Sequence, residues 1–89
     1  MQESYGIAAF RSRQQVLRFE DALMREGLNV SMVTTPREVA MGCGLSVRFA
    51  TADAERVRGV YRRVNPGNLI GFYRVDYAGG RPRVSPLFR

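Results

Sequence analysis

The sequence contains no histidine, no lysine, no tryptophan and a single cysteine among its 89 residues. A zinc site, an iron–sulfur cluster and an internal disulfide all need more than one cysteine or histidine, so this composition excludes them. It excludes serine–histidine and cysteine–histidine catalysis for the same reason. We therefore expect neither a metal site nor a cofactor.

Long apolar stretches are also missing. No run approaches the roughly 20 residues of a membrane-spanning helix, and residues 1–4 lack the basic and apolar segments of a signal peptide. We expect a protein of the reducing cytoplasm that makes no contact with membranes. An apolar content of 45% in 89 residues suits one small domain with one core. The 14 arginines and 8 carboxylates give a net charge of +6.

Hydrophobic periodicity predicts two helices and four strands. Ser12 and Gln15 have the spacing of a capping box, and Gly27 is typical of a left-handed helix end, so we expect a helix over residues 12–26. Thr51 is the expected cap of a second helix, which ends before the turn signal at 65–68. Apolar runs and alternating patterns predict the strands, at residues 5–10, 30–34, 45–49 and 69–77.

The resulting order, βαββαβ, predicts an α+β fold. Two right-handed split βαβ units form a ferredoxin-like sandwich, in which four antiparallel strands carry both helices on one face. We expect this domain to span residues 1–77. Residues 78–89 contain two glycines, two prolines and three arginines, and their composition predicts a flexible basic C-terminal tail.

The candidate site is the connection between the second and third predicted strands. It is longer than a hairpin needs, and it contains the lone thiol, Cys43, between Gly42 and Gly44. Arg37 in this connection and Arg48 on the following strand could favour the nucleophilic thiolate. Composition alone leaves a second interpretation open, in which Cys43 is a small buried hydrophobe and the glycines serve turns that need positive φ.

Several motifs carry a resemblance to a known family. A strand and a helix ending at Gly27 are followed by the Pro-Arg-Glu segment 36–38 and by the Gly-Cys-Gly-Leu segment 42–45, and Arg48 comes near the end of the next strand. This arrangement resembles the selenium/sulfur (Se/S) carrier protein-like family over about residues 5–77. The segment 78–89 extends beyond the usual end of the family.

The resemblance implies a ferredoxin-like domain whose loop cysteine carries sulfur or selenium. Cys43 would be the carrier thiol, holding a persulfide or selenide received from a donor such as a cysteine desulfurase and delivered to an acceptor enzyme. The other matching positions would surround the cargo, with Arg37 holding negative charge and Glu38 orienting Arg37; these positions are Pro36, Arg37, Glu38, Gly42, Gly44 and Arg48. We expect a carrier or accessory protein rather than a stand-alone enzyme, because the carboxylates form no recognisable acid–base pair.

The alternative is a small interaction or nucleic-acid-binding module in which Cys43 is structural. The high arginine content suits phosphate binding, and RNA-recognition domains share the βαββαβ order. However, the third strand lacks their aromatic signature, so we do not expect nucleic acid as a partner. The fourth predicted strand, 69–77, could provide the surface of a homodimer.

Overall fold

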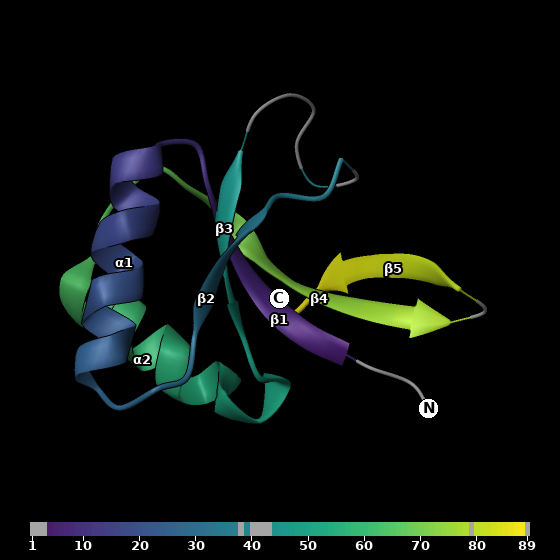
Figure 1. Ribbon diagram of the computed structural model, residues 1–89. Helices are drawn as coiled ribbons and strands as arrows, with labels where there is room; N and C mark the ends of the chain where they lie inside the picture. The colour runs from purple at the N-terminus through teal and green to yellow at the C-terminus, as the bar shows by residue number, and fades with distance from the viewer. Residues whose placement is uncertain (1–3, 38, 40–43, 79, 89) are drawn as a thin grey trace.

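The computed structural model describes residues 4–37, 39, 44–78 and 80–88. Two helices pack on one face of a five-stranded antiparallel sheet, whose β4–β5 edge extends away from them (Figure 1). In chain order the elements are β1 (Ser4–Phe10), α1 (Arg13–Arg25), β2 (Ser31–Thr34), β3 (Leu45–Phe49), the 3₁₀ helix η1 (Thr51–Asp53), α2 (Ala54–Val64), β4 (Leu69–Ala78) and β5 (Arg81–Pro86).

The strand order in the sheet is β2-β3-β1-β4-β5. The first four strands and both helices agree with the predicted α+β architecture, and their arrangement is close to the predicted ferredoxin-like sandwich. The prediction of four strands is wrong, because β5 adds a fifth at the edge beside β4. This strand lies within the segment 78–89, which we expected to be a tail. Ala78 pairs with Arg81, and Gly80 has a φ of 79°, which suits a tight hairpin turn.

Both helices begin differently from the sequence prediction. Ser12 is the N-cap of α1, but its side chain makes no capping hydrogen bond, and Gln15 donates its backbone N–H to the Ser12 carbonyl at 3.1 Å. The second helix starts with the 3₁₀ turn η1 instead of a Thr51 side-chain cap. The helix ends agree better, since Gly27 has the predicted left-handed φ of 80° and Asn65 ends α2 at a φ of 46°.

The core between sheet and helices contains a row of aromatic rings. The Phe10 ring on β1 lies 5.4 Å from that of Phe19 on α1, and Phe19 meets Tyr61 on α2 edge to face at 5.9 Å. Tyr61 continues to Phe72 on β4 at 5.5 Å, and Phe72 to Phe88 at 5.3 Å. Such edge-to-face pairs add to the energy of apolar burial. The row ties the C-terminal segment after β5 to the body of the domain.

A second buried layer lies on the sheet face opposite the helices, which we call the open face. Ala8 and Phe10 belong to the helix-side core, and because neighbouring side chains on a strand alternate, Ile7 and Ala9 point to the open face. Both are completely buried, and so is Ser46, which pairs with Ala9. The sequence alternation predicts Ser46 as an outward residue, so this expectation is wrong. The open face is therefore packed rather than bare.

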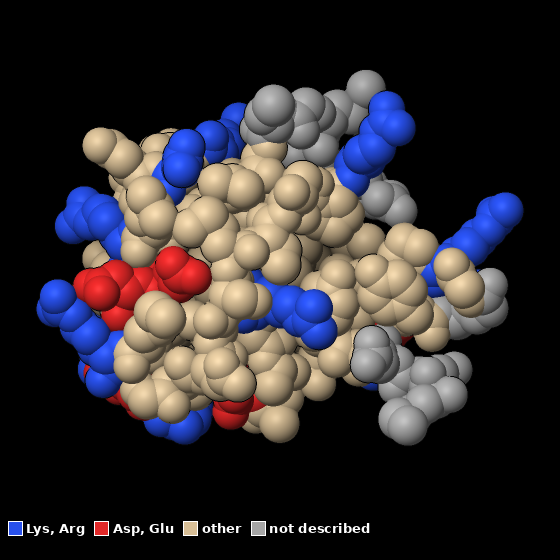
Figure 2. Space-filling view, viewed as in Figure 1, with Lys and Arg blue, Asp and Glu red and all other residues tan. Residues whose placement is uncertain are grey.

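Charge is distributed unevenly over the surface. In the view of Figure 2 the acidic side chains lie mainly over the helices, where arginines surround them, and further arginines project from the opposite side. Most of the described carboxylates are on α1, η1 and α2, namely Glu20, Asp21, Glu26, Asp53 and Glu55.

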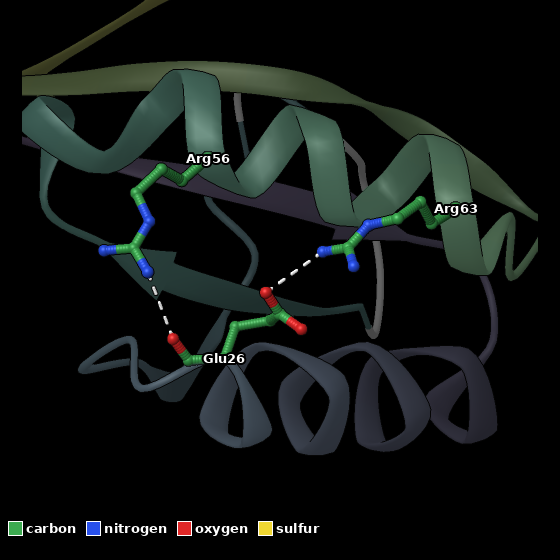
Figure 3. Close-up of polar contacts among 3 residues, drawn as sticks. All are labelled: Glu26, Arg56 and Arg63. Carbon is green, nitrogen blue, oxygen red and sulfur yellow. Dashed lines mark hydrogen bonds and ion pairs between the residues drawn. The ribbon is translucent and has the colours of Figure 1, made fainter.

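Glu26, at the end of α1, connects the two helices (Figure 3). Its backbone carbonyl accepts a hydrogen bond from Arg56 Nη2 at 3.1 Å, and its carboxylate forms an ion pair with Arg63 Nη2, also at 3.1 Å. Basic groups are favourable at a helix C-terminus, where carbonyls are left without partners. These contacts are exposed and add little to stability, but they set where the α1 end lies against α2.

Candidate functional site

The predicted site lies in the connection between β2 and β3, residues 36–43 together with Gly44. Three of its candidate residues, Glu38, Gly42 and Cys43, lie outside the described residues. The structure describes Arg37, which is exposed, and Gly44, which precedes β3. Arg37 and Gly44 lie on either side of Cys43 in the sequence. The described part of the site therefore consists of the two ends of the connection, which we call its frame.

The base of the connection is closed by hydrogen bonds. Thr35 donates its backbone N–H to the carbonyl of Gly44 at 2.9 Å, which extends the β2–β3 ladder by one step beyond the strands. The Thr35 and Ser46 hydroxyls form a buried hydrogen bond with an oxygen separation of 2.7 Å. On the first arm of the connection, Val39 donates its N–H to the Pro36 carbonyl at 3.0 Å. Hydrogen bonds therefore hold the two ends of the connection together where it leaves β2 and rejoins β3.

Gly44 is explained by close packing and not by a turn. A Cβ atom at this position would lie 3.1 Å from Thr35 Oγ1 and 3.3 Å from Thr35 Cβ, which is tighter than most real contacts. The described glycines with positive φ are others, namely Gly27, Gly67 and Gly80. The interpretation of Gly44 as a residue that supplies positive φ is therefore wrong. Because Gly44 has no side chain, the Thr35 side chain can pack directly beside its backbone.

Arg48 lies at the other end of β3. It pairs with Ser31 on β2 and with Ile7 on β1, and its guanidinium carbon is 4.0 Å from the centre of the Tyr5 ring. It is four positions after Gly44 in the sequence, which corresponds to about 13 Å along an extended strand. The structure therefore pairs Gly44 with Thr35 at the start of the connection, two residues before Arg37, and places Arg48 in a separate group with Tyr5.

The sequence did not predict the residues that support the ends of the connection and the Arg48 side chain. Thr35 and Ser46 fix the base of the connection, and both are almost completely buried. Tyr5 supports Arg48, and its ring lies 6.4 Å from that of Tyr77 on β4. Burial raises the pKa of Tyr5 above its ordinary value of 10.0, as does the hydrogen bond with Tyr77, while Arg48 acts in the opposite direction. A signal was available for Thr35 alone, which directly precedes the Pro-Arg-Glu segment.

Among the described residues, no helix has both the length and the apolar character needed to cross a membrane. The family model described as "Putative Se/S carrier protein-like" matches residues 5–67, which is more than half of the chain. The match covers β1 to α2 and the turn after it, including the whole β2–β3 connection, and it ends before β4. No curated protein and no solved structure matches the chain.

Proposed function

Because this chain belongs to the Se/S carrier protein-like family, we propose that it carries a sulfur or selenium atom on Cys43 and passes it from a donor enzyme to an acceptor enzyme. The family match is the observation that carries this proposal, since it spans the connection that contains Cys43. The sequence adds that Cys43 is the only thiol, so no other side chain could hold a persulfide.

The proposed transfer is an exchange between sulfur atoms. The Cys43 thiolate attacks the terminal sulfur of a persulfide on the donor, for example a cysteine desulfurase. The bond between that sulfur and the donor cysteine breaks, and the donor cysteine leaves as a thiolate, so that Cys43 now holds the persulfide. An acceptor thiolate repeats the attack and releases Cys43 as a thiolate. Neither step needs a general acid or a redox partner, which suits a chain without histidine.

The frame of the connection supports this role. A carrier thiol must enter the sites of two other proteins, so it needs a position that protrudes from a fixed base. Thr35, Ser46 and Gly44 provide such a base directly beside Cys43 in the sequence. Arg37 is exposed on the other arm, where a guanidinium favours the thiolate over the thiol. We propose that Glu38 orients Arg37 and that Gly42 and Gly44 leave space for a docking partner.

Surface charge supports the proposed encounter with donor and acceptor. Arg37 in the connection is exposed, and the whole chain has a net charge of +6. Complementary charge speeds association and orients the partners. We therefore propose that both enzymes present acidic surfaces around their own reactive groups.

Alkylation kinetics test the thiolate part of the proposal. We expect a neutral alkylating agent to react with Cys43 in the folded protein, with the pH midpoint of the rate below about 8.5, the value of a free cysteine. Arg37→Gln should move this midpoint upward. Arg62→Gln changes an exposed arginine on α2 and is the matched control, so it should leave the midpoint unchanged. A folded protein whose thiol does not react would contradict a carrier role.

The second candidate function is a protein-interaction module with a structural Cys43. The open face favours it, because it combines the Tyr5, Arg48 and Tyr77 side chains, and tyrosine and arginine are enriched at interfaces. A protein that forms a homodimer with buried Cys43 and accepts no sulfur would support this function over the carrier. Light scattering of the wild type and of Tyr77→Ala distinguishes the homodimer from a monomer.

A further inference from the structure

A surface hollow of about 280 Å³ lies at the end of the sheet away from the β2–β3 connection. It is formed where β1 begins, β2 begins and β3 ends. Its lining residues come from these three strands and their flanks, and they are Ser4, Tyr5, Asn29, Val30, Ser31, Arg48, Phe49 and Ala50. The family match and the proposed carrier function assign no role to this hollow.

Arg48 is the charged group of the hollow. Its guanidinium lies against the Tyr5 ring at 4.0 Å, a cation–π contact that fixes one face of the group. Among the residues that the structure describes, Arg48 forms no ion pair, and the described lining contains no carboxylate. A stacked guanidinium keeps the N–H groups along its edges available, and these match oxyanions in a bidentate manner.

Tyr5 is itself held in place from the neighbouring strand. Its ring lies 6.4 Å from that of Tyr77 on β4. The contacts therefore run from Tyr77 through Tyr5 to Arg48 across the open face. Holding an arginine in this way before a ligand arrives lowers the entropy cost of binding.

Neutral hydrogen-bonding groups complete the lining. Ser31 is directly opposite Arg48 in the β2–β3 register, and Ser4 and Asn29 contribute a hydroxyl and an amide. A phosphate group has more acceptor oxygens than a carboxylate, so it can use one guanidinium and several neutral donors together. We propose that this hollow binds the phosphate group of a small molecule, with Arg48 as the charged contact and Ser4, Asn29 and Ser31 as neutral contacts.

The hollow is at a distance from Gly44, the described residue that follows Cys43 in the sequence. Arg48 is about 13 Å along β3 from Gly44, by the rise of an extended strand. Phosphate binding and sulfur loading should therefore be lost through substitutions at different residues. A variant at Arg48 can be compared with a variant at Cys43 in both assays.

The test is a titration followed by NMR on protein with ¹⁵N-labelled backbone and arginine side chains. Inorganic phosphate and O-phosphoserine are added at constant ionic strength, and acetate is added in a parallel series. We expect saturable shifts at Arg48 Nε and at the Ser4 and Ser31 amides, with weaker effects of acetate. Arg48→Gln should raise the dissociation constant about tenfold or more, as loss of a charge-assisted hydrogen bond does. Arg62→Gln, the control on α2, should leave it unchanged.

Other outcomes would overturn the proposal. Shifts that are absent, or that are equal in wild type and Arg48→Gln, would show that Arg48 is not the ligand. Equal binding of acetate would contradict the choice of phosphate. A single-stranded oligonucleotide that binds more tightly than phosphate, and that is weakened equally by Arg48→Gln and Arg62→Gln, would indicate general attraction to polyanions.

Discussion

The Thr35 and Ser46 hydroxyls lie 2.7 Å apart in a buried hydrogen bond between the end of β2 and the second residue of β3. Neither side chain contacts solvent appreciably, since their exposed fractions are 3% and 0%. Because buried hydroxyls need partners, each residue satisfies the other. The pair fixes the frame from which the connection containing Cys43 extends.

Removal of both partners of this pair should destabilise the protein by less than the sum of the two single removals. Thr35→Val and Ser46→Ala each leave a buried hydroxyl unpaired, which costs about 1–3 kcal/mol of unfolding free energy. The double variant should lose less than the sum of the two. Urea denaturation of all four proteins gives the coupling energy. Strict additivity would show that the two hydroxyls do not depend on each other.

Two glycines should respond to alanine with opposite signs. A Cβ atom at Gly6 on β1 would overlap the Phe49 ring, so Gly6→Ala should destabilise the fold by about 1–3 kcal/mol. Gly59 lies in α2 with open space around the Cβ position, so Gly59→Ala should stabilise the helix by roughly 0.5–1 kcal/mol. Thermal denaturation measures both. A neutral Gly6→Ala would mean that the Phe49 ring can move aside.

The residues after β5 should contribute to stability. Phe88 packs edge to face on Phe72, and the guanidinium carbon of Arg58 lies 4.7 Å from the centre of its ring. Because Phe88 is only partly buried, Phe88→Ala should cost on the order of 2 kcal/mol, less than a fully buried phenylalanine. Arg83→Ala changes an exposed residue of β5 and is the control, expected within about 0.5 kcal/mol of wild type. Equal effects of the two variants would contradict docking of the C-terminal segment.

Stability should fall at alkaline pH through Tyr5. Burial and the Tyr77 hydrogen bond raise its pKa above 10.0 in the folded state, so folding favours the protonated hydroxyl. The corresponding stabilisation is fully present below pH 10.0 and is lost as pH rises through the raised pKa. Tyr5→Phe has no hydroxyl to ionise, so it lacks this pH-dependent loss of stability. The difference in unfolding free energy between wild type and variant should therefore change as pH rises through this range. A difference that stays constant with pH would contradict this account.

The sequence predicts those parts of the fold that depend on local pattern. Alternation and helical periodicity give the first four strands and both helices, because each buries one face against the same core. The pairing of β5 with β4 depends on contacts outside the segment, such as Phe88 on Phe72, and composition alone does not show them. The Gly79-Gly80 pair is a hairpin signal that the expectation of a tail overlooked.

The sequence predicts where in the chain the candidate site lies, but not how its residues are arranged in space. Arg37 and Gly44 follow from the motif and lie where the connection leaves and rejoins the sheet. The motif also includes Arg48, and an extended strand carries this residue about 13 Å from Gly44. Burial of Ser46 could not be deduced from alternation, because the open face is packed as well.

The proposed carrier function requires that Cys43 accepts and releases sulfur. The most direct measurement is the intact mass of the folded protein after incubation with a cysteine desulfurase and cysteine, with Cys43→Ala in parallel and a reductant added afterwards. We predict a gain of one sulfur on the wild type alone, which the reductant removes. An unchanged mass, or the same gain on Cys43→Ala, would contradict the carrier role.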